Sequence, residues 1–128
     1  ITDPSGQYSS MYKPFHLIGL ELGISVASIG IRGEATGAPI CWHGDVVATA
    51  KRDLKAGELL DGEGGYTVYG KLMPAQESLA LGGLPLGLAH GVKLLKPVKA
   101  GQAVSWNDVA FDANSTAVKF RREMEQSF

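Results

Sequence analysis

The sequence predicts a mainly β fold with flanking α-helices, in which a module of short strands contains an internal repeat. Glycine supplies 17 of the 128 residues, which is about twice its usual share, and most glycines lie between short apolar runs, as turns between strands do. The phrase LKAGELL at Leu54–Leu60 returns as VKAGQAV at Val98–Val104, 98 − 54 = 44 residues later. We expect a helical segment with a linker at 1–43, the β module at 44–110 and a C-terminal helix within 111–128.

The N-terminal part contains an apolar run whose residue spacing is compatible with either a strand or a helix. Alternating apolar residues from Ile18 to Val26 would suit a strand, whereas Gly19, Gly23 and Ala27 recur at helical spacing. We favour a helix at about 14–32, because Pro14 suits a first helical turn, Gly33 suits the end and the run is long for one strand. Such a helix is apolar almost all round, so another surface must cover it.

The central part alternates short strand patterns with turn signals. DVVATAKRDL (45–54) reads as a strand and a turn, DGEGG (61–65) as a turn, and YTVYGKLM (66–73) as a strand of alternating β-formers. VKLLKPV (92–98) and AVSW (103–106) are further short strands. At the C-terminus, Ala117, Phe120 and Met124 share one helical face, which predicts an amphipathic helix at about 114–126 with Asn114 or Ser115 able to cap its start.

The repeated phrase predicts a structural device. Gly57 and Gly101 occupy matching positions and can adopt a positive φ without steric cost, as tight turns between strands often require. The shared residues include no nucleophile and no metal ligand. We therefore expect paired turns that give the β module a pseudo-two-fold repeat.

The order of these motifs resembles a known family. The D-L-K-A-G-E-x-L phrase, the segment Leu84–Pro85–Leu86–Gly87 and the second phrase followed by Trp106–Asn107–Asp108–Val109 resemble a SAF domain. This β-clip module occurs in type III antifreeze proteins and in the C-terminal part of sialic acid synthases. The resemblance spans Val46 to Val109.

The flanks extend the resemblance. MYKPFHLIGLELGISVASI, DGEGGYTVYGKLMPA and AVKFRREME are similar to the C-terminal region of bacterial homoserine-dehydrogenase-like oxidoreductases, one branch of which resembles deoxyxylulose-phosphate reductoisomerase. The resemblance implies a non-catalytic accessory domain that contributes to domain packing, an oligomer interface or closure of the substrate site. It also implies that NAD(P) binds in an upstream catalytic domain, which would be this chain's partner. The start at Ile1 fits a piece of a longer protein.

Several other functions are disfavoured by composition. A net charge of −1 without a basic stripe argues against nucleic acid as a partner. The apolar run Leu17–Ile31 is short for a membrane span and contains Glu21. A single cysteine, Cys41, suits the cytoplasm. GEGGYTVYG departs from G-x-G-x-x-G at Thr67, so we expect no cofactor site within this chain, and no residue spacing predicts a metal site.

The residues to consider for chemistry are Tyr12, Lys13, His16 and Glu21, which would lie at a domain junction and could reach the parent's active site. His16 and Glu21 are five residues apart and should not stack on a helix. The alternative is that all four are surface or interface residues. A free-standing carbohydrate- or ice-binding module is a further alternative, although the many charges between Lys51 and Glu63 argue against a flat, mildly apolar binding face.

Overall fold

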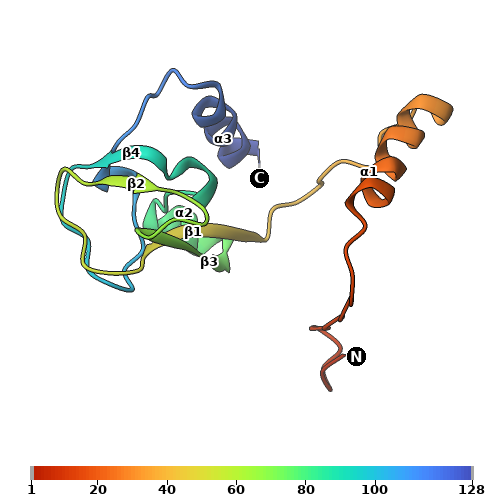
Figure 1. Ribbon diagram of the computed structural model, residues 1–128, viewed down its shortest axis with the longest axis horizontal. Coiled ribbons are helices and arrows are strands. Elements are labelled where there is room, and N and C mark those ends of the chain that lie inside the picture. The colour runs from red at the N-terminus through yellow and green to blue at the C-terminus, as the bar shows by residue number, and fades with distance from the viewer. Residues whose placement is uncertain (1, 128) are drawn as a thin grey trace. The chain divides into compact units, whose positions relative to one another are not determined.

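A computed structural model describes residues 2–127 of the chain, which separates into two compact units, Ile1–Pro39 and Ile40–Phe128. The first unit contains α1 (Ile18–Ala27), which continues without a break into a π-helical turn, η1 (Ser28–Arg32). The second unit contains all five named strands and two further α-helices (Figure 1). The structure thus confirms a β-rich module with flanking helices.

The helix of the first unit ends where the sequence predicts and begins later. Gly33 has φ 67°, its N–H donates to the carbonyl of Ile29, and the N–H of Glu34 donates to that of Ser28, which is a glycine-dependent helix stop. The predicted start near residue 14 is wrong. The first helical hydrogen bonds are accepted by the carbonyl of Leu17, whose own backbone is not helical. Residues 14–17 therefore precede the helix.

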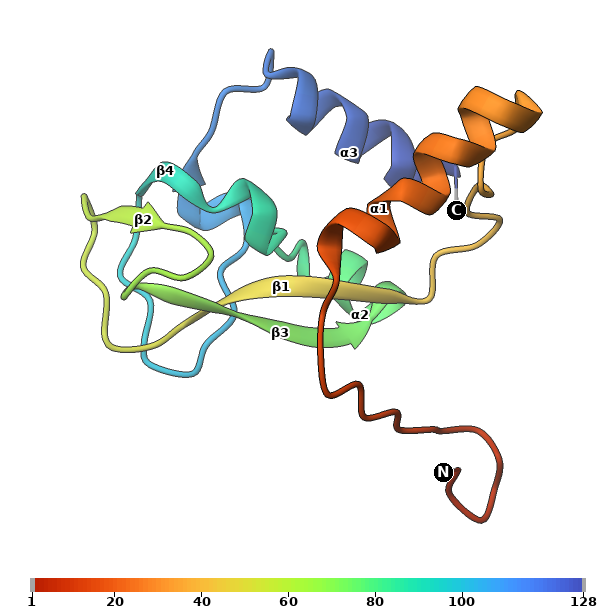
Figure 2. The same ribbon diagram turned by 45° about the vertical axis from the view of Figure 1, so that its right-hand side comes forward.

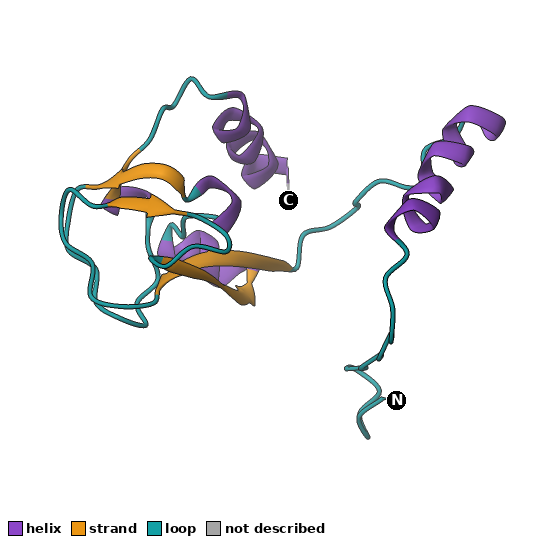
Figure 3. Ribbon diagram, in the orientation of Figure 1, coloured by secondary structure: helices purple, strands orange, loops and turns teal. Residues whose placement is uncertain are grey.

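The second unit is built from two small antiparallel sheets (Figures 2 and 3). In the first sheet β1 (Gly44–Ala50) pairs with β3 (Val68–Pro74), in a register that runs from Gly44↔Pro74 to Ala50↔Val68. The second sheet has the order β2–β4–β5, with a bulge in the β2–β4 pairing. The remaining bounds are β2 (Leu59–Asp61), β4 (His90–Leu94), β5 (Val109–Ala110), α2 (Ala75–Leu81), α3 (Thr116–Ser127) and the 3-10 turns η2 (Leu86–Leu88) and η3 (Trp106–Asp108).

Two predicted elements differ in detail. The AVSW segment forms isolated bridges, Ala103 to Thr49 and Ser105 to Gly83, because its residues pair with different segments in turn. The C-terminal helix begins at Thr116, since Asp112 first closes a turn by accepting the N–H of Asn114 on its side chain and that of Ser115 on its carbonyl.

The repeated phrase forms the predicted pair of turns. Gly57 has φ 90° and Gly101 has φ 78°. The N–H of Gly57 donates to the carbonyl of Leu94, and the N–H of Gly101 donates to that of Ala50, which is the residue 44 positions before Leu94. The two copies therefore make the same backbone contacts with the module, as a pseudo-two-fold repeat requires.

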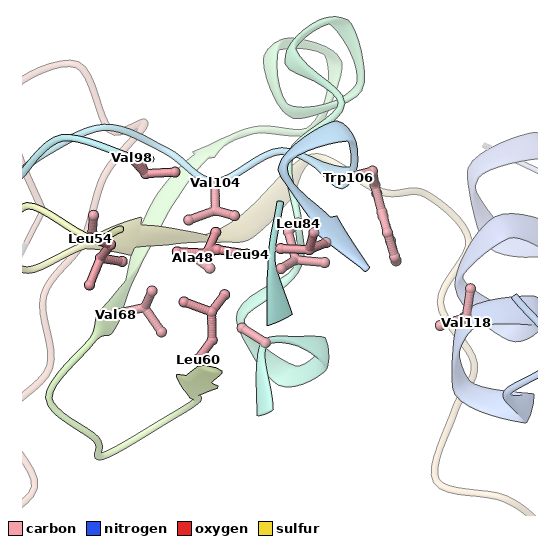
Figure 4. Close-up of a cluster of buried hydrophobic side chains, with 13 residues drawn as sticks. Ala48, Leu54, Leu60, Val68, Leu84, Leu94, Val98, Val104, Trp106 and Val118 are labelled. Carbon is pink, nitrogen blue, oxygen red and sulfur yellow. The ribbon is translucent and has the colours of Figure 1, made fainter. Parts of the chain in front are cut away.

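A single apolar core lies inside the β module (Figure 4). Leu54 and Val98, which open the two copies of the phrase, both belong to it, as do Leu60 and Val104 near their ends. The other buried members are Ala48, Ala50, Val68, Leu84, Ala89, Leu94, Trp106, Val109 and Val118. Because Val118 belongs to α3, this helix is part of the module.

Candidate functional site

Three of the four residues singled out from the sequence come together at the start of α1. The Glu21 carboxylate forms an ion pair with Lys13 through Oε1, and its Oε2 lies 2.7 Å from Nδ1 of His16. The expectation that His16 and Glu21 stay apart is wrong, because His16 precedes the helix and its ring lies against the first turn. Tyr12 is 88% exposed and makes no hydrogen bond within residues 2–127.

This group, which we call the Glu21 cluster, has the residue types of an acid–base site. A carboxylate can orient an imidazole for proton transfer, and a neighbouring ammonium can stabilise a developing negative charge. The His16 side chain is 76% exposed, so within the first unit the cluster is open to water. Chemistry that requires a dry site therefore requires a further surface over it.

The rest of the first unit presents an apolar surface. No residue of α1 or η1 is buried. We define the apolar helix surface by its exposed large side chains, which are Leu17, Ile18, Leu20, Leu22, Ile24, Val26, Ile29 and Ile31. Such exposure over a whole helix is typical of an element that another protein surface covers.

The second unit contains a buried ionic cluster that the sequence did not predict. Arg121 of α3 donates from Nη1 and Nη2 to the Asp45 carboxylate of β1, at 3.0 and 2.6 Å, and from Nε to Glu125 at 2.7 Å. Ser78 of α2 also donates to Asp45, at 2.5 Å, and the Arg121 guanidinium lies 4.5 Å from the centre of the Trp42 ring. The cluster therefore joins three elements of the module.

The electrostatics of this cluster are those of a structural clamp. Burial raises the pKa of Asp45, but the hydrogen bonds from Arg121 and Ser78 outweigh it, so the pKa lies below its ordinary value. Burial lowers the pKa of Arg121, and the bonds to Asp45 and Glu125 more than compensate. Both groups stay charged and paired. Only the Arg121–Glu125 spacing of four residues was visible in the sequence, because Asp45 lies 76 positions away.

The two repeated turns hold themselves with matching side-chain caps. Glu58 Oε1 accepts the N–H of Lys55 at 2.7 Å, and Gln102 Oε1 accepts that of Lys99 at 3.1 Å. The turns also contact each other through Asp53, whose carboxylate accepts from Lys99 Nζ at 2.8 Å and from the N–H of Ala100 at 3.0 Å. The side chains of Glu58, Lys99 and Gln102 therefore all stabilise the paired turns.

The glycine-rich loop at 61–67 is closed by its own first residue. Asp61 accepts hydrogen bonds from the N–H of Tyr66 at 2.5 Å, from the N–H of Thr67 at 3.0 Å and from the Thr67 hydroxyl. These hydrogen bonds lower the pKa of Asp61 to about 2, and the bond from the Thr67 hydroxyl has the largest effect. The amides of Tyr66 and Thr67 are therefore occupied by a carboxylate, and they are not free to hold a phosphate.

The remaining candidates for chemistry are few. Residues 2–127 contain no group of three or more His, Cys, Asp or Glu side chains placed to hold a metal ion. Cys41 is exposed and free. In the described part of the chain, every helix is too short or too polar to cross a bilayer.

Comparison with known protein families identifies the second unit. Residues 45–110 match the family model described as SAF domain. No curated protein matches the chain.

Proposed function

The chain belongs to the SAF domain family through residues 45–110, and from this premise we propose that it is a non-catalytic accessory module of a cytoplasmic NAD(P)-dependent oxidoreductase similar to homoserine dehydrogenase. The module would pack against an upstream catalytic domain that binds NAD(P), and would contribute to domain packing, to an oligomer interface or to closure of the substrate site. Mixed strands and helices around one closed core suit such an accessory or binding role.

One observation supports this proposal above the others: the apolar helix surface belongs to the first unit, while the β module of the second unit already has its own core. The buried side chains all belong to residues 45–118, and none comes from α1. Fully burying one Leu, Ile or Val contributes about 1.5–3 kcal/mol, so eight such side chains offer on the order of 10 kcal/mol to association before ordering costs. A surface of this size would be unusual without a partner.

The experiment has two parts, and the first tests for a cofactor site. The 128-residue chain is titrated with NADPH by isothermal calorimetry. We expect no binding, because the amides of the glycine-rich loop are already bonded to Asp61. Micromolar affinity for NADPH would contradict the non-catalytic proposal.

The second part tests the apolar helix surface. Leu20 and Ile24 lie one turn apart on α1, and both are largely exposed. We expect the unmodified chain to self-associate and to bind a hydrophobic dye, and the Leu20→Glu/Ile24→Glu variant to lose both properties. Ile40→Glu is the matched control, since Ile40 is 90% exposed but lies outside the helix, and it should behave like the unmodified chain. A monomeric unmodified chain that binds no dye would contradict the proposed interface.

The Glu21 cluster supports a second candidate function, in which this chain supplies part of the parent's active site. The motivating observation is that one carboxylate holds both Lys13 and His16. In the full-length enzyme, His16→Ala and Glu21→Gln should then lower turnover, while Lys119→Ala on α3 should leave it unchanged. Unchanged turnover in the first two variants would remove this candidate.

A further inference from the structure

The linker that leads into the second unit is exposed until just before β1. Residues 35–41 are all exposed, and within residues 2–127 their backbone groups make no backbone hydrogen bond. Trp42 is the first residue after them that is partly buried, and the carbonyl of His43 accepts the N–H of Ala75 at 2.8 Å. The linker is therefore fastened to the β module through the two residues that precede β1.

The Trp42 side chain is held by an arginine whose orientation is fixed. The Arg121 guanidinium lies 4.5 Å from the centre of the Trp42 ring, a distance at which a cation is attracted to an aromatic face. The same guanidinium donates two hydrogen bonds to Asp45 and one to Glu125, and the Arg121 side chain is only 10% exposed. Because three hydrogen bonds fix the plane of the guanidinium, the face that it presents to Trp42 is fixed as well.

Glu125 holds a second arginine in the same way. Its Oε1 accepts from Nε of Arg121 at 2.7 Å, and its Oε2 accepts from Nη1 of Arg122 at 2.8 Å. The Arg122 guanidinium lies 4.1 Å from the centre of the Trp106 ring, which belongs to the core. One carboxylate of α3 thus orients two arginines, and each of them lies against a tryptophan. Trp106 is the tryptophan of the core and Trp42 is the tryptophan at the end of the linker.

We propose that Trp42, Arg121 and Glu125 form a strap that fastens the end of the linker to α3 and fixes the point from which the linker leaves the SAF module. With the strap closed, the free part of the linker is residues 35–41. Each extended residue adds about 3.5 Å to the reach of a chain, so release of Trp42 and His43 would lengthen the tether by about 7 Å. Glu125 is a positioning residue, since it acts on the linker only through Arg121. The strap does not depend on which partner covers the apolar helix surface.

The native cysteine provides a direct probe of the strap. Cys41 is the only cysteine of the chain, is exposed and directly precedes Trp42. It is labelled with a nitroxide in full-length chains that carry Leu20→Glu and Ile24→Glu, so that α1 does not promote self-association. The electron paramagnetic resonance spectrum then reports how freely the end of the linker rotates.

Substitutions of Trp42 test the contact with Arg121. We expect a restricted spectrum for the chain that keeps Trp42, and a mobile fraction about fivefold larger in Trp42→Leu, because the cation–π contact is lost. Trp42→Phe keeps an aromatic face and should stay restricted. Trp42→Leu leaves the Asp45–Arg121 pair in place, so its circular dichroism should be native.

A substitution on α3 tests the positioning role of Glu125 at a distance from the label. Glu125→Gln keeps the size of the side chain but removes the charge that orients both arginines, so it should also raise the mobile fraction. Glu123→Gln is the matched control, since Glu123 is exposed on the same helix, and it should leave the spectrum unchanged.

Three outcomes would each overturn the strap. They are a mobile spectrum in the chain that keeps Trp42, an unchanged spectrum in Trp42→Leu, and equal effects of Glu125→Gln and Glu123→Gln. If Glu125→Gln fails to fold, the comparison of Trp42→Leu with Trp42→Phe still decides whether the strap exists. The NADPH titration is independent of these measurements, so the strap and the proposed accessory function fail separately.

Discussion

Leu54 and Val98 exchange both of their backbone hydrogen bonds: the N–H of Leu54 donates to the carbonyl of Val98 at 2.8 Å, and the N–H of Val98 donates back at 3.1 Å. Each residue opens one copy of the repeated phrase, so the first residue of one copy bonds the first residue of the other. A residue that bonds its own counterpart in both directions lies at the pseudo-two-fold axis. The two copies of the phrase in the sequence therefore correspond to two segments related by a pseudo-two-fold axis and joined by an antiparallel bridge.

The turn glycines should be the residues of the phrase least tolerant of replacement. We expect Gly57→Ala and Gly101→Ala each to lower the free energy of unfolding by about 1–2 kcal/mol, because an alanine is strained at their positive φ values. A Cβ would meet Lys93 only at 3.8 Å at Gly57 and nothing within 4 Å at Gly101, so the cost is conformational. Urea denaturation measures it.

Gly87→Ala is the matched control for these turns. A Cβ there also meets nothing within 4 Å, and φ is not positive, so Gly87→Ala should be neutral or slightly stabilising. Equal losses at Gly57, Gly101 and Gly87 would show that the turns have no special requirement for glycine.

The Asp45–Arg121 pair should stabilise the module far more than a surface ion pair does. Arg121→Met leaves the Asp45 carboxylate, which is 7% exposed, without its cation, and we expect a loss of about 3 kcal/mol in the free energy of unfolding. Lys99→Met breaks the exposed pair with Asp53, which water screens, and its effect on the free energy of unfolding should be much smaller. Similar losses in the two variants, measured by urea denaturation, would contradict a clamp at Arg121.

The sequence could predict features that depend on local interactions, but not those that depend on contacts between residues far apart in the chain. The turns at Gly57 and Gly101 and the stop at Gly33 depend on the local backbone, and their residue types identified them. The pairing of Asp45 with Arg121 depends on tertiary contact, so no local pattern pointed to it. The contact of His16 with Glu21 was missed for a related reason: the spacing argument assumed that both residues lie on one helix, whereas the helix begins only after Leu17.

Gly83 should be a further position where glycine is required, because a side chain there lacks space. A Cβ at this residue would come within 2.9 Å of Val47 Cγ2 and 3.0 Å of Ser78 Oγ, and both neighbours are buried. We expect Gly83→Ala to lower the free energy of unfolding by about 1–3 kcal/mol through overpacking. Adding Val47→Ala to this variant makes room for the new methyl group, so the double variant should lose less stability than the sum of the two single variants. Losses of unfolding free energy that simply add would argue against the collision.

Asp61 should make the stability of the module depend on pH in the acid range. Its pKa is about 2 in the folded chain against an ordinary value of 3.8, so the folded state binds its proton less readily than the unfolded state does. The stabilisation is therefore complete above pH 3.8 and is lost as the pH falls through about 2. The difference in unfolding free energy between the unmodified chain and Asp61→Asn should shrink over this window.

Taking a difference is necessary because Asp45, Asp53, Glu58 and Asp108 also have lowered pKa values and contribute to the same acid transition. Glu63→Gln is the matched control, since Glu63 lies in the same loop and makes no hydrogen bond within residues 2–127. Its denaturation profile should follow that of the unmodified chain at every pH. A constant difference between Asp61→Asn and the unmodified chain from pH 5 to about 2 would show that the loop does not depend on the Asp61 charge.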